Sequence, residues 1–256
     1  MPYLPSAKRG YTSRVPLWLI VNAILYKLKT GTQWRYMPMK DLFVDKDYTW
    51  QGVYHHFQKW SKDGTWECVW NKLLDKNRTK LDMSSVQLDG SHTPVKRGGI
   101  EVGYQNRKKC KTSNLLFITD SRGIPLSCSN VISGEHNDAF ELEKYVDEML
   151  DGLQQSKLTY DGLFLNADAG FDIESFRRYC LGKGIVANID FNPRNNKEQQ
   201  HLFDEELYKD RYVIERTNAW IDGFKTLLIR YETNAKHWRA WHFIAFTVIL
   251  LRNLKV

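Results

Sequence analysis

The chain lacks the features that mark membrane-spanning, exported and zinc-binding proteins. No stretch approaches the roughly 20 apolar residues that a membrane helix needs, and the opening MPYLPSAKRGYTSR lacks the apolar core of a signal peptide. The four cysteines are scattered and form no C-x-x-C pair, which argues against a zinc site and is typical of reduced thiols. There is also no internal repeat. These absences predict a cytoplasmic protein without a membrane segment.

Positive charge is concentrated in the first third of the chain. Residues 1–84 contain 14 Lys and Arg against 7 Asp and Glu, whereas the remainder contains 23 of each. The whole net charge of +7 therefore lies in this region. A basic region attached to a neutral one indicates a part that binds a polyanion, joined to a part with another task. Solubility alone is the alternative explanation for an excess of this size.

The same third has a helical pattern. Apolar residues recur with a period of 3.6 over three stretches, 17–28, 50–60 and 66–74. Gly31 is expected to end the first helix, and Thr49 to cap the second. The turn SKDG separates the last two helices, which predicts a helix-turn-helix-like unit whose helix from about Thr65 to Leu74 enters a DNA groove. A plain helical bundle has the same periodicity.

Beyond residue 84 the pattern changes to strands that alternate with helices. Short apolar segments predict three consecutive strands, followed by helix, strand, helix, strand and a last long helix. We therefore expect an α/β fold of the mixed-sheet (α+β) type over residues 85–256, preceded by a small all-helical domain over residues 1–84. A short polar insertion is expected near residues 191–210, and Asp138 is positioned to cap the helix over 138–150.

Three carboxylates are notable for their positions. Asp89 lies in the first predicted strand, and Asp168 lies at the C-terminal end of the fourth, where α/β sheets usually bind ligands. Ala169 and Gly170 follow Asp168, so a sharp turn should leave its carboxylate at the rim of the sheet. Asp172 is the better cap for the next helix, which leaves Asp168 without an evident structural task.

The third carboxylate, Glu215, lies on the last long helix. Residues at steps of three or four form one polar stripe on this helix, namely Tyr208, Arg211, Glu215, Asn218 and Asp222. Arg211 can pair with Glu215 across one helical turn. On a solvated face such a pair contributes only about 0.3–0.5 kcal/mol, and a surface ion pair of this kind is the alternative to a functional site.

The chain resembles DDE-type insertion-sequence transposases of the small bacterial group four/five kind. The segment LDGSHTPV is similar to that of the first catalytic Asp, and NADAGFD resembles the Asp-x-Gly-aromatic motif of the second. YKDRYVIERTNAW matches the family signature of Tyr, two residues, Arg, three residues and Glu. LKTGTQWRYMP and YHHFQKWSKDGTWE are similar to the helical N-terminal region of the same group. The resemblance covers nearly the whole chain.

The resemblance implies a ribonuclease-H-like core that cleaves and transfers DNA strands. Asp89, Asp168 and Glu215 would be both catalytic residues and ligands of two Mg²⁺ ions, with Mn²⁺ as a substitute. Hard oxygen donors are the ligands that Mg²⁺ prefers. The partners implied are double-stranded DNA, as terminal inverted repeats and target, and a second copy of the chain in the DNA complex. The protein would be bacterial and bound to the nucleoid when it acts.

Several basic and aromatic side chains are candidates for positioning the DNA. Tyr208 and Arg211 belong to the family signature. That signature often has a lysine after the glutamate, for which Lys225 is the nearest candidate. The basic run KRGGIEVGYQNRKKCK is expected to hold the DNA backbone, chiefly through Arg107, Lys108 and Lys109. A solvated hairpin is the alternative reading of this run.

Three other functions remain as alternatives. A ribonuclease-H-like nuclease without strand transfer would share the acids but would not join DNA ends. A catalytically inactive DNA-binding protein from a truncated element would use the basic third alone. A glycosidase with two carboxylates would need no metal ion, but it would leave the third acid and the basic third unexplained.

Overall fold

The computed structural model describes residues 3–4, 13–44, 46–193 and 202–254. The α-helices are α1 (Leu17–Thr30), α2 (Met39–Leu42), α3 (Trp50–Lys62), α4 (Thr65–Asn77), α5 (Leu142–Gln155), α6 (Glu174–Gly182), α7 (Glu205–Lys209), α8 (Val213–Asp222), α9 (Lys225–Leu228) and α10 (Ala235–Asn253). The strands are β1 (Ser85–Pro94), β2 (Gly103–Gln105), β3 (Cys110–Asp120), β4 (Pro125–Cys128), β5 (Ile132–Ser133), β6 (Phe164–Ala167) and β7 (Val186–Ile189). Short 3₁₀ turns are η1 (Trp34–Tyr36), η2 (Arg78–Lys80), η3 (Ala169–Phe171) and η4 (Asp210–Tyr212).

The local signals for the first helices are confirmed. Gly31 ends α1 in the left-handed conformation, with φ 70°, and its N–H donates to the Lys27 carbonyl. Thr49 caps α3 through its hydroxyl oxygen, which accepts from the N–H of Gly52. The expected third helix is α4, which begins directly after the turn at Gly64.

One mixed sheet forms the centre of the fold. Its strand order is β2-β3-β1-β6-β7, and β4 and β5 also pair with β3. β3 runs antiparallel to β1, β2, β4 and β5, whereas β6 runs parallel to both β1 and β7. The prediction was three consecutive strands followed by strands that alternate with helices; the structure has five strands before α5, of which the short β2 was not predicted. The expected α/β mixed sheet is confirmed.

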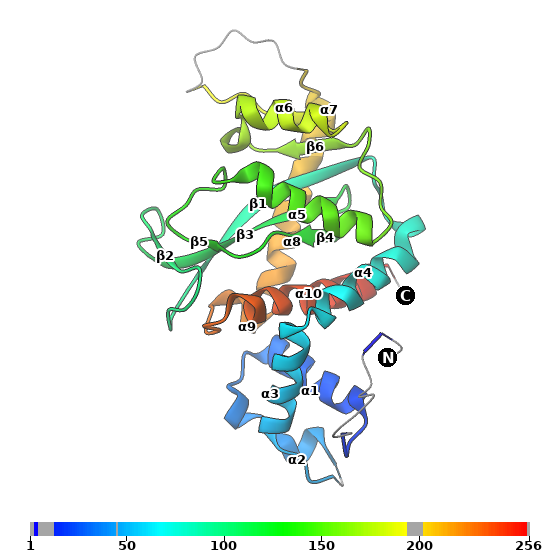
Figure 1. Ribbon diagram of the computed structural model, residues 1–256, viewed down its shortest axis with the longest axis vertical. Coiled ribbons are helices and arrows are strands. Elements are labelled where there is room, and N and C mark those ends of the chain that lie inside the picture. The colour runs from blue at the N-terminus through cyan, green and yellow to red at the C-terminus, as the bar shows by residue number, and fades with distance from the viewer. Residues whose placement is uncertain (1–2, 5–12, 45, 194–201, 255–256) are drawn as a thin grey trace.

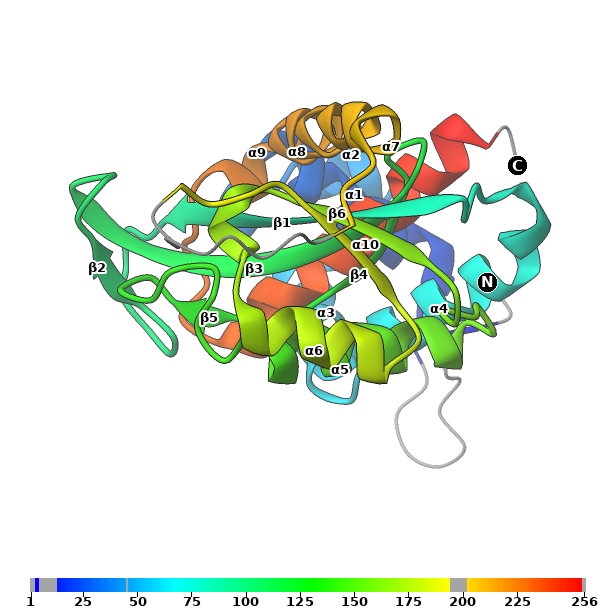
Figure 2. The same ribbon diagram turned by 90° about the horizontal axis from the view of Figure 1, so that it is seen from above.

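Helices cover both faces of this sheet. Seen from above, α8 and α9 lie on one side of β1 and β6, and α5 and α6 lie on the other (Figure 2). The last predicted helix is divided, since α7 and α8 are joined by the 3₁₀ turn η4. α7 lies in the segment expected to be a polar insertion, of which residues 194–201 fall outside the described residues. Among the described helices, none is both long and apolar enough to cross a membrane.

α10 joins the N-terminal helices to the sheet (Figure 1). Trp241 on α10 stacks on Phe57 of α3, with ring centroids 4.2 Å apart, and on Trp34 at 5.9 Å. On the other side, Phe246 of α10 contacts Phe117 of β3 edge to face. We call Trp34, Phe57 and Trp241 the aromatic joint. Buried packing thus runs across the predicted domain boundary, and the division at residues 84 and 85 stays a prediction.

The apolar side of α4 packs into the core. Trp66, Trp70 and Leu74 are buried on this helix, and the Trp70 indole N–H donates to the Leu126 carbonyl of β4 at 2.9 Å. α4 packs between α10 and the β4–α5 side of the sheet. Its apolar period reflects this core position, while Lys72 and Lys76 on the other side of the helix are exposed. The entry of α4 into a DNA groove stays a prediction.

Candidate active site

The pairing of β1 with β6 places Asp89 and Asp168 on the same face of the sheet. Gln87 of β1 is the partner of Asn166 of β6, and each aspartate lies two residues further along its chain. Side chains two residues apart point to the same face of a strand. The amide of Asn166 donates to the Leu207 carbonyl of α7, so this is the face covered by α7 and α8.

Asp89 is the electrostatic centre of this face. Burial raises its pKa to about 6; the N–H of Gly90 acts against this shift, and the negative charges of Asp138 and Asp168 add to it. The charge of Arg211 lowers the pKa again, to a smaller extent. Asn218 of α8 donates to Asp89 Oδ2 at 3.3 Å. A half-desolvated carboxylate with acidic neighbours is the environment that a cation would stabilise.

Asp168 follows β6 directly, as predicted, but it does have a structural task. Its carboxylate accepts from the N–H of Gly170 at 2.8 Å and caps the turn η3. The expectation that Asp168 lacks such a role was therefore wrong. Asp172 also differs from the prediction, because Ile173 rather than Asp172 precedes α6. Asp172 instead forms a buried ion pair with Arg177, at 2.7 Å.

The Glu215 side chain does not reach the two aspartates in this structure. It is 71 % exposed, and its Oε1 lies 3.9 Å from the Arg211 guanidinium, which is the geometry of the surface ion pair. The residues one turn before and after it, Arg211 and Asn218, both act on Asp89. Glu215 therefore lies on the stripe of α8 that faces the aspartates. Among the described residues, no three His, Cys, Asp or Glu side chains lie close enough together to hold a metal ion.

The first two residues of the signature lie beside the aspartates. The Arg211 guanidinium lies over the Tyr208 ring, 5.8 Å from its centroid. Burial raises the pKa of Tyr208, and the charges of Asp190 and Asp168 raise it further. The structure therefore places Tyr208 near Asp168, and Arg211 between Tyr208 and Glu215.

The other predicted DNA-positioning residues lie on α9 and on the turn between β2 and β3. Lys225 is exposed on the first turn of α9, where its Cβ approaches Gly31 at the end of α1. Arg107, Lys108 and Lys109 form the turn between β2 and β3. Lys108 Nζ donates to the His92 carbonyl at 2.6 Å, which holds this turn against β1. Their contact with DNA stays a prediction.

Asp138 was assigned by its position to cap a helix, and that assignment was wrong. α5 begins only at Leu142 and its N-cap is Glu141, with no side-chain cap bond. Asp138 instead lies against Gly90, where an added Cβ would overlap its carboxylate. Its Oδ1 accepts from the amide of Asn114 on β3 at 2.6 Å. A glycine inside a strand can mark such a close approach, and Gly90 was the one signal available in the sequence.

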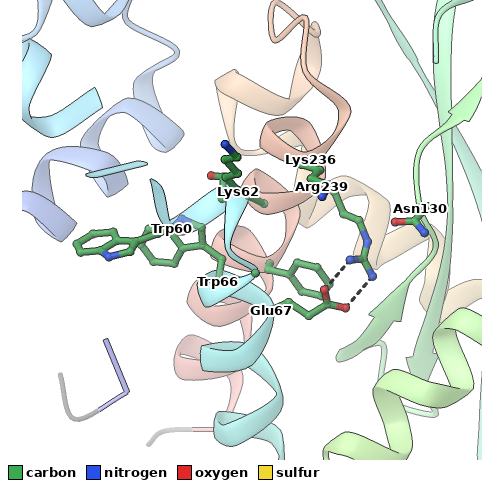
Figure 3. Close-up of a pocket in the computed structure, with 11 residues that line it drawn as sticks. Trp60, Lys62, Trp66, Glu67, Asn130, Lys236 and Arg239 are labelled. Carbon is green, nitrogen blue, oxygen red and sulfur yellow. Dashed lines mark hydrogen bonds and ion pairs between the residues drawn. The ribbon is translucent and has the colours of Figure 1, made fainter. Parts of the chain in front are cut away.

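A pocket elsewhere in the molecule contains none of these residues. It lies where α3, α4 and α10 meet, and Trp60, Trp66 and Phe243 form part of its wall (Figure 3). Arg239 and Glu67 form a two-bond ion pair there, with N–O distances of 2.6 and 2.8 Å. Because this pair satisfies both charges, we interpret the pocket as part of the helix packing.

Family models match almost the whole length of the chain. Residues 1–70 match the model described as "Putative transposase of IS4/5 family", and residues 78–251 match "Transposase DDE domain". The chain is also similar to a putative transposase for insertion sequence element IS402 from Burkholderia cepacia, with 32 % identity over 127 residues. That match spans 46 % of this chain and 53 % of the relative, so the chain spans about half the length of the relative that it matches.

Two solved structures are similar at a low level. The Mos1 transposase paired-end complex with left transposon end is 13 % identical, with 93 % of this chain and 79 % of that chain covered and a TM-score of 0.30. The Mos1 mariner paired end complex with Mn is 12 % identical, with 98 % and 82 % covered and a TM-score of 0.31. With TM-scores this low, the two structures carry no argument about the fold, which is defined by the strand order of the sheet. The sheet order and the match over residues 78–251 agree, and the chain belongs to the DDE-domain transposases of the IS4/5 group.

Proposed function

We propose that this protein is an insertion-sequence transposase that uses Asp89, Asp168 and Glu215 for metal-dependent cleavage and transfer of DNA strands. The observation that carries the proposal is the convergence of Asp89 and Asp168 on one sheet face, beside the helix that bears Glu215. The raised pKa of Asp89, caused first by burial and then by neighbouring charges, supports a site that a bound cation would stabilise. Family membership supports the same reaction.

The residues fit a divalent metal ion by their chemistry. All three are carboxylates, and Mg²⁺ and Mn²⁺ prefer hard oxygen donors. Asp89 and Asp168 already influence each other electrostatically, and a bound cation would offset their repulsion. Asp89, Asp168 and Glu215 would hold two ions. When bound, such ions activate an oxygen nucleophile and stabilise the leaving oxygen at phosphorus.

The chain's own side chains position the acids and the DNA. Asn218 fixes one oxygen of Asp89 by its hydrogen bond. Arg211, on the turn η4 before α8, acts on Asp89 and pairs with Glu215, so it can orient Glu215 or contact a phosphate. The Tyr208 ring contacts the Arg211 guanidinium by a cation–π interaction, which helps to hold Arg211 in place. Loss of Arg211 would leave the acids without their nearest compensating charge.

Contacts to the DNA backbone would come from the basic surfaces. The turn of Arg107, Lys108 and Lys109 projects beyond the sheet at the end of β2 (Figure 1). Residues 1–84 carry the whole net charge of +7. We propose that these surfaces hold the terminal inverted repeats and the target duplex, with Lys225 contacting a phosphate and two copies of the chain in the complex. Such contacts would make binding strongly dependent on salt.

The direct test is a cleavage assay on the element's own ends. The full chain is incubated with a duplex that contains the flanking inverted repeat, with and without Mg²⁺. We expect nicked and joined products only with Mg²⁺, and their loss in Asp168→Asn with DNA binding retained. Cleavage without joining would support a nuclease instead. DNA binding that never leads to a nick, in Mg²⁺ or Mn²⁺, would support the catalytically inactive alternative.

A further inference from the structure

Asp138 is an acid of this region that the family motifs do not include. It lies between β5 and α5, and 37 % of its side chain is exposed. Neighbouring residues of a strand point to opposite faces. Asp138 lies where the Cβ of Gly90 would be, so it approaches β1 from the face opposite to the Asp89 side chain. Asp89 Oδ1 in turn accepts from the N–H of Gly90 at 2.8 Å. The backbone of Gly90 therefore lies between the two carboxylates.

The position of Asp138 is fixed by a hydrogen bond from Asn114, and His92 lies close by. Asn114 of β3, which is fully buried, donates to Asp138 Oδ1 at 2.6 Å. His92 of β1 is the strand partner of Asn114, and its Nε2 lies 3.6 Å from the same oxygen. The remaining amide oxygen of Asn114 is buried without a hydrogen-bond partner among the described residues. Leaving this oxygen unpaired costs free energy of folding. A purely structural amide would not be expected at such a place, whereas an amide that orients Asp138 would.

Gly90 makes this arrangement possible. Any side chain at residue 90 would overlap the Asp138 carboxylate, so only glycine allows the acid to reach the backbone of β1. Without a side chain at this point, only the backbone of Gly90 separates the Asp138 charge from Asp89. The Asp138 carboxylate thus lies against the same residue whose N–H donates to Asp89.

We propose that Asp138 is a positioning residue of the active site: held against Gly90 by Asn114, it strengthens the binding of a divalent cation at Asp89 through its negative charge. This inference rests on the proposed function, because it takes Asp89 as a metal ligand. Asp138 acts from the opposite face of β1 and contacts neither the DNA nor the reacting atoms in this role. It adds to the negative potential that attracts the cation.

The test measures Mn²⁺ binding directly, by electron paramagnetic resonance of free Mn²⁺ in titrations of the full chain, alone and with an end-containing duplex. Asp138→Asn keeps the size of the side chain and an oxygen that can accept from Asn114. We expect about tenfold weaker Mn²⁺ binding in this variant, for the loss of one nearby charge. Gly90→Ala should weaken binding in the same direction, because the methyl group displaces Asp138. Asp151→Asn, on the exposed last turns of α5, is the matched control and should bind as wild type.

The outcomes separate the inference from the proposed function. If Asp89→Asn loses Mn²⁺ binding while Asp138→Asn binds as wild type, Asp138 has only a structural role and the inference is wrong. If the wild-type chain binds no Mn²⁺, alone or with the duplex, or if Asp89→Asn binds it as well as wild type, the proposed metal site is wrong and the inference falls with it. Thermal unfolding of each variant without metal shows whether it is folded, and only a folded Asp138→Asn with weakened binding supports the inference.

Discussion

The aromatic joint and the acidic site are built on opposite principles. In the joint, Trp241 is fully buried against Phe57 and Trp34, and its indole N–H donates to the Glu232 carboxylate at 3.2 Å. At the acidic site, Asp89 is held beside two further negative charges, and its pKa is raised by burial to about 6. The joint stabilises the fold, whereas the crowded carboxylates of the acidic site destabilise it when no cation is bound. Such a cost is expected where a bound cation is needed for function.

The largest effect on stability should come from the joint. Replacing Trp241 by Ala removes a fully buried indole that contacts α3 and leaves a cavity. We expect the free energy of unfolding to fall by about 3–5 kcal/mol. Chemical denaturation measures the loss, and Trp18→Ala on α1 is the control, since that indole is 50 % exposed. A loss in Trp241→Ala no larger than in the control would mean that the joint does not hold the helices to the sheet.

At the acidic site, a substitution should change the free energy of unfolding by less, and should raise it rather than lower it. The folded pKa of Asp89 is about 6 and lies above its ordinary value of 3.8. The contribution of Asp89 to the stability of the wild-type protein should therefore become unfavourable as pH rises from about 4 to about 6, and remain so above that. Asp89→Asn lacks this titration, so without metal it should be more stable than wild type by roughly 1–3 kcal/mol at pH 7.5.

The difference between Asp89→Asn and wild type should shrink towards zero near pH 4. Denaturation at the two pH values, in the presence of a chelator, provides the measurement. Asp151→Asn keeps Asp89 and is the control, so its difference from wild type should not change with pH. An Asp89→Asn variant that is less stable than wild type at pH 7.5 would show that the carboxylate is stabilised rather than strained. The site would then resemble the joint, and the contrast between the two regions would be lost.

The sequence predicted those features that depend on neighbours along the chain. The end of α1 at Gly31 and the cap of α3 at Thr49 follow from local backbone chemistry. The placement of Asp89 within a strand and of Asp168 directly after one followed from the apolar pattern and from the family motifs. Their common face follows from the parallel register of β1 and β6, which the structure shows and the sequence alone did not.

The features that were missed depend on residues distant in the sequence. The apolar period of α4 predicted a buried side but not its neighbours, which are α10 and β4. Asp138 reaches Gly90 from nearly fifty residues away, and no local rule connects them. Asp168 caps a single 3₁₀ turn, which is too short to leave a periodic pattern. Glu215 was placed on the right stripe, but its rotamer beside Arg211 has no signature in the sequence.

The most direct test of the three-carboxylate site is Glu215, because its contribution to stability and its role in cleavage should differ most. Its exposed ion pair with Arg211 predicts a change of less than about 0.5 kcal/mol in the stability of Glu215→Gln. Cleavage of an end-containing duplex in Mg²⁺ should nevertheless fall by about 10²–10³-fold. Glu215→Asp should be impaired nearly as much, since the shorter side chain loses reach, with partial recovery in Mn²⁺. Wild-type cleavage rates in Glu215→Gln would contradict the proposal and leave Glu215 as a surface ion pair.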